Sequence, residues 1–121
     1  MPKYLLVARD TPEGQQVWMK LSPQEVQAAI AQYQAWSERV AAQGKLKEGQ
    51  KLRDGEGKVL RGHGKSLKVT DGPHSESKEI IGGFWILEAS SYDEAVKLAA
   101  DSPHLEHGSL ELREIEDMSG H

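Results

Sequence analysis

The sequence predicts an α+β domain in which an antiparallel sheet carries two helices on one face. Two short, almost continuously apolar runs are typical of buried strands, and two capping boxes each mark the start of a helix. Two helices are too few to cover both faces of a sheet, which argues against a doubly wound fold. At 121 residues the chain is long enough for one core, so we expect a single domain over residues 1–121.

The strands are predicted from the apolar runs. Tyr4–Ala8 is expected to lie in the middle of the sheet, and a loop is expected to follow it. Gly83–Ala89 is a second buried strand, and Leu110–Ile115 is the last one. Between them, Lys45–Arg61 contains short β-like pieces broken by glycines, with Asp54-Gly55 as a hairpin turn, and Leu67 and Val69 mark a further strand.

The longer helix begins at the capping box Ser22-Pro23-Gln24-Glu25 and ends at Gly44. Its apolar stripe consists of Val26, Ala29, Ile30, Tyr33, Trp36 and Val40. The shorter helix begins at the capping box Ser91-Tyr92-Asp93-Glu94 and stops before Pro103. The resulting β-α-β(β)β-α-β order, with an extra β-hairpin, is most simply a ferredoxin-like arrangement. Because such a sheet leaves one face open, we expect a homo-oligomer, most simply a dimer.

The amino-acid composition indicates which binding partners and which cellular compartment to expect. The net charge is −4, and the basic residues are dispersed, so nucleic acid is not an expected partner. The absence of cysteine excludes disulfides and thiol chemistry. No run approaches the ~20 apolar residues of a membrane helix, and no secretory signal is recognisable, so we expect a cytoplasmic protein with no membrane partner.

A long motif runs from Val69 to Glu79 (VTDGPHSESKE) and continues as Ile81-Gly82-Gly83-Phe84. It resembles the signature of the DGPF-domain branch of the YCII-related family, with His74 in place of a phenylalanine. The Ser-Pro-x-Glu helix start and His107-Gly108 are also similar to that family. The resemblance implies the fold of the dimeric α+β barrel proteins, which include small monooxygenases, isomerases and a dehydrochlorinase-like branch. It also implies an association of some members with extracytoplasmic-function sigma factors.

Many YCII-related proteins pair a helix-borne histidine with an aspartate just before a proline. Asp101, in Asp101-Ser102-Pro103, roughly matches the aspartate, but the long helix has no histidine and carries Tyr33 and Trp36 instead. The chain therefore departs from the His–Asp pattern that the resemblance implies.

We expect a polar site near the Asp-Gly-Pro turn, although such a turn also has a purely structural interpretation. The expected catalytic residues are Asp71, Glu76, Lys78 and His107, because carboxylates and imidazole serve as general acids and bases. The expected ligand-binding residues are Arg113, Glu79, His74 and Asp101. Arg113 has a second interpretation, as a partner of Glu111 at an oligomer interface.

His104 and His107 have the H-x-x-H spacing of some metal sites, but no third ligand is obvious nearby, so we expect no metal and no cofactor. The first functional hypothesis is a cofactor-free enzyme that performs proton transfer, elimination or isomerisation on a small molecule. The alternative is a non-catalytic module that binds a small ligand or regulates transcription with a sigma factor.

Overall fold

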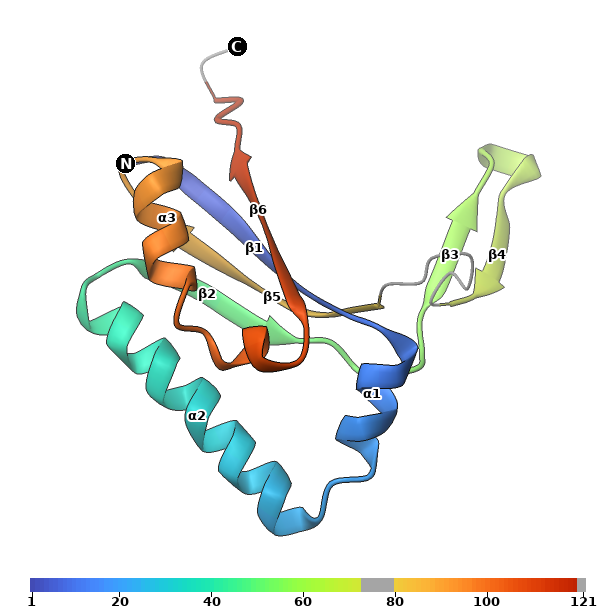
Figure 1. Ribbon diagram of the computed structural model, residues 1–121. Helices are drawn as coiled ribbons and strands as arrows, with labels where there is room; N and C mark the ends of the chain where they lie inside the picture. The colour runs from blue at the N-terminus through green and yellow to red at the C-terminus, as the bar shows by residue number, and fades with distance from the viewer. Residues whose placement is uncertain (73–79, 120–121) are drawn as a thin grey trace.

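The computed structural model describes residues 1–72 and 80–119 (Figure 1). The strands are β1 (Lys3–Asp10), β2 (Leu46–Lys51), β3 (Lys58–Arg61), β4 (Lys68–Asp71), β5 (Ile80–Glu88) and β6 (Ser109–Ile115). The α-helices are α1 (Pro12–Met19), α2 (Pro23–Ala42) and α3 (Tyr92–Ala99), and two 3₁₀ turns are η1 (Gly64–Ser66) and η2 (Pro103–Glu106). Within the described residues, no helix has the length and apolar character needed to span a bilayer.

The main sheet has the strand order β2-β5-β1-β6, and every neighbouring pair is antiparallel. β1 is central, as predicted, with Leu6 opposite Trp85 of β5 on one side and Leu112 of β6 on the other. Together with the two helices that follow β1 and β5, this order is the ferredoxin-like arrangement. The α+β fold class expected from the sequence is therefore confirmed.

Helices α2 and α3 begin where the capping boxes predict. The backbone N–H of Glu25 donates to the Ser22 hydroxyl at 3.1 Å, and the Ser22 N–H donates to the Glu25 carboxylate at 3.0 Å. At the start of α3, Ser91 also accepts from the N–H of Glu94, at 3.2 Å, but the Glu94 carboxylate accepts from the Ser90 N–H and not from Ser91, so only half of this predicted capping box forms. At the other end of α2, Gly44 has a φ of +72°, the left-handed exit that glycine adopts without strain.

The core lies between the sheet and the two helices α2 and α3. Trp36 of α2 is fully buried, and its indole N–H donates to the Leu98 carbonyl of α3 at 3.0 Å, so the two helices are tied to each other as well as to the sheet. Trp85 of β5 packs edge-on against Trp36, with ring centroids 5.2 Å apart. The buried cluster consists of Tyr4, Leu6, Trp36, Val40, Leu87, Ala89, Ala95, Leu98 and Ala99.

Within residues 1–72 and 80–119, neither α2 nor α3 lies over the opposite face of the sheet. Because β residues alternate between faces, the register of the three strands β1, β5 and β6 places one half-buried apolar set on this face. That set is Leu5, Val7, Phe84 and Ile86, and we call it the open-face patch. Charged side chains border it, including the ion pair between Arg9 and Glu111.

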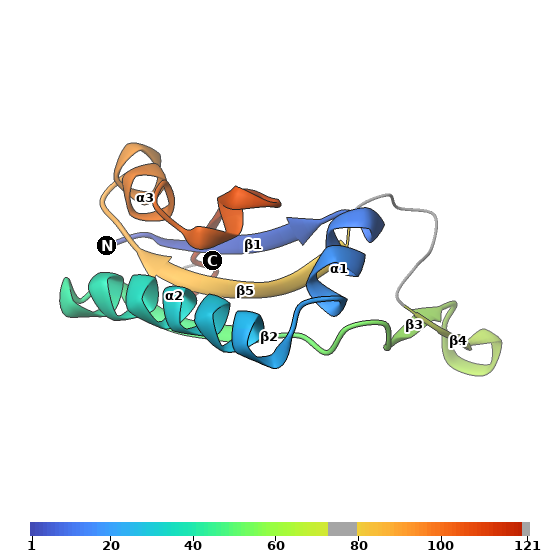
Figure 2. The same cartoon turned by 60° about the horizontal axis from the view of Figure 1, so that its bottom comes forward.

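Two elements differ from the sequence expectation. Residues 12–19 form the helix α1 and not a loop, because Thr11 caps it by accepting from the Gly14 N–H at 3.0 Å and Pro12 occupies its first turn. Asp54-Gly55 does not join paired strands: β2 pairs with β5, whereas β3 pairs with β4 in a separate two-stranded sheet. This β3–β4 hairpin projects away from the rest of the protein in both views (Figures 1 and 2).

Candidate active site

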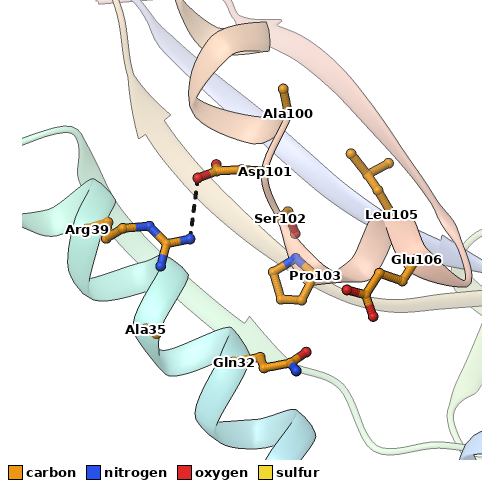
Figure 3. Close-up of a pocket in the computed structure, with 9 residues that line it drawn as sticks. All are labelled: Gln32, Ala35, Arg39, Ala100, Asp101, Ser102, Pro103, Leu105 and Glu106. Carbon is orange, nitrogen blue, oxygen red and sulfur yellow. Dashed lines mark hydrogen bonds and ion pairs between the residues drawn. The ribbon is translucent and has the colours of Figure 1, made fainter.

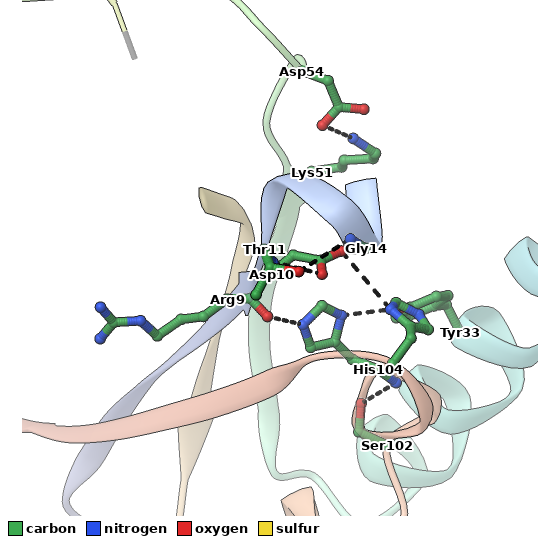
Figure 4. A network of polar contacts seen from close by, with 10 residues as sticks. Arg9, Asp10, Thr11, Gly14, Tyr33, Lys51, Asp54, Ser102 and His104 are labelled. Carbon is green, nitrogen blue, oxygen red and sulfur yellow. Dashed lines mark hydrogen bonds and ion pairs between the residues drawn. The ribbon is translucent and has the colours of Figure 1, made fainter. Parts of the chain in front are cut away.

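Four polar side chains meet where β1 ends (Figure 4). Asp10 is the last residue of β1, Tyr33 comes from the middle of α2, His104 lies within η2, and His107 directly follows η2. We call these four residues the Tyr-His cluster. The Tyr33 hydroxyl lies 3.1 Å from Nδ1 of His104 and 3.3 Å from Nε2 of His107, so one phenol bridges two imidazoles.

His104 is held in place from several directions. It is 6% exposed, and Nε2 lies 2.7 Å from the carbonyl oxygen of Arg9. Ser102 caps η2 by accepting from the His104 N–H at 3.3 Å. Gly108 leaves room for the ring, since a Cβ at that position would lie 2.5 Å from both Nε2 and the Arg9 carbonyl oxygen.

These contacts determine the tautomer of His104. Burial lowers the pKa of His104, and repulsion from a charged His107 lowers it further, so the ring is held in its neutral form. The Arg9 carbonyl can only accept, so the proton of neutral His104 is on Nε2 and Nδ1 is an acceptor. The Tyr33 hydroxyl therefore donates to Nδ1 of His104, and its oxygen accepts from Nε2–H of His107.

Tyr33 is kept as a phenol. Burial is the main cause that raises its pKa to about 12, and the negative charges of Asp10 and Glu106 add to the effect. Its ring stacks with Trp85 at a centroid distance of 6.4 Å and an interplanar angle of 10°. Trp85 in turn covers Gly49 of β2, where a Cβ would lie 2.5 Å from the indole ring. The phenol is thus positioned by the aromatic packing of the core.

Asp10 supplies the negative charge of the cluster. One of its carboxylate oxygens accepts from the Thr11 N–H at 2.8 Å, and the other lies 3.9 Å from Nδ1 of His107. The Asp10 side chain is 14% exposed, compared with 39% for His107. A Cβ at Gly14 would lie 2.1 Å from the carboxylate, so this glycine of α1 makes room for it.

His104, Tyr33 and His107 form a row of hydrogen-bonded groups, and His107 is the end of that row that solvent can reach. His107 is the most exposed imidazole of the cluster, and its Nδ1 faces the Asp10 carboxylate and carries no proton in the neutral tautomer derived above. This geometry suits general acid–base chemistry at His107.

A groove lies beside the cluster, between α2 and η2 (Figure 3). Its volume is about 480 Å³, within the range of small-molecule sites. Asp101 lines it and pairs with Arg39 at 3.3 Å. None of the four cluster side chains lines this groove, so we place the chemistry at the Tyr-His cluster, where the titratable groups meet, and not in the groove.

The residues expected from the sequence are distributed over several places. His107 belongs to the Tyr-His cluster, and Asp101 lines the neighbouring groove. Asp71 ends β4 on the projecting hairpin, where its side chain is 88% exposed and pairs with Lys58 at 2.5 Å. Arg113 lies 3.9 Å from Glu111 and is 73% exposed. The four other expected residues, His74, Glu76, Lys78 and Glu79, lie outside the described residues.

Asp10 and Tyr33 were not expected at the site from the sequence. Asp10 was placed in a loop, and Tyr33 was interpreted as part of the apolar stripe of the long helix. His104 was considered only as a metal ligand, yet both of its ring nitrogens bond to Arg9 and Tyr33. In the parts of the chain that the structure describes, no three His, Asp or Glu side chains are grouped as metal ligands would be.

Comparison with known proteins agrees with this fold. The 5-chloro-2-hydroxyhydroquinone dehydrochlorinase of Burkholderia phenoliruptrix AC1100, solved in complex with 2,5-dihydroxybenzoquinone, aligns with a TM-score of 0.53 and 20% identity over 98% of this chain and 97% of its own. Comparison with curated protein sequences finds no match. A family model described as the YCII-related domain matches residues 2–119. The match covers nearly the whole chain, which therefore belongs to the YCII-related family.

Proposed function

We propose that this protein is a cofactor-free enzyme that moves a proton on a small organic substrate, with His107 as the general base. The observation that carries the proposal is the contact of one phenol with two imidazoles, next to a carboxylate. A purely structural cluster would need only satisfied hydrogen bonds. Here the outermost imidazole is exposed to solvent and has a carboxylate ready to stabilise its cationic form.

In the proposed reaction, Nδ1 of His107 removes a proton from an acidic C–H or O–H of the substrate. The electron pair left behind either shifts to a neighbouring carbonyl, which gives isomerisation, or expels a leaving group such as chloride, which gives elimination. Asp10 stabilises the imidazolium. The Tyr33 oxygen accepts from Nε2–H and so keeps the ring oriented through the step, and the imidazolium then returns its proton to product or water.

Two comparisons support the reaction class. The chain belongs to the YCII-related family, and the protein with which it shares its fold is a dehydrochlorinase, solved with a small dihydroxyquinone. Loss of hydrogen chloride from a chlorinated hydroquinone requires a base for the proton and an exit for chloride. The Tyr-His cluster supplies such a base in the exposed imidazole of His107.

The test uses a panel of chlorinated and unchlorinated hydroxyhydroquinones with purified protein. Proton exchange from substrate carbon is followed by NMR in D₂O, and elimination is followed by chloride release. We expect His107→Gln to lower the rate by about 10²–10⁴, the usual contribution of a general base. His63→Gln, on the exposed η1 turn of the hairpin, is the matched control and should keep the wild-type rate.

Equal rates for His107→Gln and wild type would refute the assignment of His107 as the base. If no member of the panel is turned over but one binds and shifts the His107 resonances, the ligand-binding alternative replaces the enzyme.

We also propose that the protein forms a homodimer through the open-face patch. Four apolar side chains at the centre of an uncovered sheet, bordered by charged residues, have the composition of an interface core with a polar rim. The half-buried Arg9–Glu111 pair lies at that rim, where a second copy would shield it from solvent. Sedimentation equilibrium of the wild type measures the dimer directly, and a monomer at 100-micromolar-scale concentrations would exclude it.

A further inference from the structure

The β3–β4 hairpin is set apart from the main sheet. Its two strands pair with each other and with no strand of the main sheet in the described residues. It leaves the protein at the end of the sheet where β1 finishes and β5 begins, and both views show it extending away from the helices (Figures 1 and 2). An isolated two-stranded hairpin is marginally stable in water, so packing against another surface would stabilise it.

The register of the hairpin separates its side chains into two faces. Leu60 is directly opposite Val69, and these side chains are 62% and 55% exposed, with Leu67 at 47%. On the other face Arg61 is directly opposite Lys68.

The charges of the chain are unevenly distributed along it. The hairpin tip, residues 61–68, contains Arg61, Lys65 and Lys68 and no acidic residue, a formal charge of +3 in a chain whose net charge is −4. Residues 106–117 contain five acidic residues and one arginine, a formal charge of −4, and they include the whole of the edge strand β6. We call residues 106–117 the acidic edge; its acidic members are Glu106, Glu111, Glu114, Glu116 and Asp117.

We propose that the β3–β4 hairpin is a dimerisation arm whose basic tip binds the acidic edge of a second copy of this chain. The inference rests on the proposed dimer and adds a second contact to it. The hairpin is rooted at the end of the sheet where β1 finishes, whereas Glu114 and Glu116 lie at the opposite end, where Ile115 is paired with Lys3. A two-fold axis perpendicular to the strands brings these opposite ends together, because it reverses the direction of one sheet relative to the other.

The same geometry accounts for the apolar face of the arm. In the protomer, Leu60, Leu67 and Val69 are 62%, 47% and 55% exposed, whereas an arm laid along a second copy buries them at the contact. Because each copy contributes one arm and one acidic edge, the contact occurs twice in the dimer and satisfies closed symmetry. The charges select the partner and the direction of packing, and the apolar side chains supply the buried area.

The experiment is a charge swap measured by sedimentation equilibrium at low salt. We expect Lys65→Glu/Lys68→Glu to raise the dimer Kd about tenfold or more, and Glu114→Lys/Glu116→Lys to do the same. Mixing the two double variants should restore association in a heterodimer, because both arm–edge contacts then pair opposite charges. Lys20→Glu/Lys97→Glu is the control with the same net charge as the tip variant, on exposed positions of the main body, and should leave Kd unchanged.

Each result is decisive. A wild-type protein that is monomeric refutes both the dimer and the arm. A dimer whose Kd does not change in the tip variant refutes the proposed role of the hairpin as a dimerisation arm and leaves the open-face dimer standing. This holds even if the tip also binds nucleic acid. Weakening by both double variants without restoration in the mixture refutes the pairing of the tip with the acidic edge. The test requires no substrate, so the proposed catalytic function stands or falls separately.

Discussion

Gly108→Ala tests whether the Tyr-His cluster depends on the exact fit of His104 against the backbone of β1. The added Cβ would lie 2.5 Å from Nε2 of His104 and 2.5 Å from the Arg9 carbonyl oxygen, both closer than atoms can approach. The imidazole therefore has to turn, and the segment at Gly108 also has to shift away from the Arg9 carbonyl of the central strand. The hydrogen bond between Nε2 and the Arg9 carbonyl, 2.7 Å in length, is then lost.

The magnitude follows from two opposing effects. Leaving the buried N–H of His104 without an acceptor costs about 1–3 kcal/mol. Replacing glycine by alanine also restricts the unfolded chain, which stabilises the fold by about 0.4–1 kcal/mol. Gly108 does not have a positive φ, so no backbone strain is added. We therefore expect the free energy of unfolding to fall by about 0.5–2 kcal/mol.

Urea denaturation measures that change, and ¹⁵N NMR of the imidazole nitrogens reports the tautomer of His104. The matched control is Gly82→Ala in β5, where an added Cβ meets nothing within 4 Å and φ is not positive. This control should be neutral or slightly stabilising. If Gly108→Ala is as stable as Gly82→Ala and His104 keeps its proton on Nε2, the argument that Gly108 positions the ring is refuted.

Three further predictions concern the cluster and the core. Burial lowers the pKa of His104 below its ordinary value of 6.5, so its contribution to stability is complete above pH 6.5 and is lost as the pH falls below that value. In urea denaturation at a series of pH values, His104→Gln should reduce this loss of stability at acidic pH. The raised pKa of Tyr33, about 12, has the opposite sign, so stability should decline as the pH rises above about 10, and Tyr33→Phe should remove the latest tyrosinate absorbance step. Trp36→Phe leaves the Leu98 carbonyl in the core without its indole donor, and it should lower the free energy of unfolding by about 1–3 kcal/mol in thermal or urea denaturation. Trp18→Phe on α1 is the control and should cost much less.

Helices α2 and α3 and the central strand were predictable because local signals and tertiary packing agree. Ser22 and Ser91 form the caps that their motifs imply, and the Tyr4–Ala8 run becomes the central strand. The hairpin turn at Asp54-Gly55 was predicted wrongly, because a turn signal does not say which strands pair across it. β2 pairs with the longer strand β5, far along the chain, and such a long-range pairing cannot be read from the local sequence.

The candidate site was harder to predict because its residues are far apart in the sequence. Tyr33 and His104 are separated by 71 positions, and their contact depends on how α2 crosses the sheet. A tyrosine within an apolar helical stripe normally indicates core packing, and the Tyr33 ring does pack in the core while its hydroxyl reaches the imidazoles. Asp10 had a usable signal: a carboxylate at the end of a buried strand, four residues before a glycine that leaves it space.

The position of Tyr33 explains how this chain departs from the pairing of a helix-borne histidine with an aspartate before a proline. The helix contributes a phenol in place of an imidazole, and the imidazoles come from the segment that follows Asp101, at positions 104 and 107. Asp101 pairs with Arg39 on the surface, so the carboxylate that faces an imidazole is that of Asp10. The titratable groups of the Tyr-His cluster therefore come from η2, from the residue after it and from the end of β1, and Tyr33 brings helix α2 into contact with them. The variant Tyr33→His would replace the phenol with a third imidazole. It would remove the hydroxyl that donates to His104 and accepts from His107, and so disrupt the hydrogen bonds that orient His107. It would not rebuild the pairing of a helix-borne histidine with an aspartate before a proline.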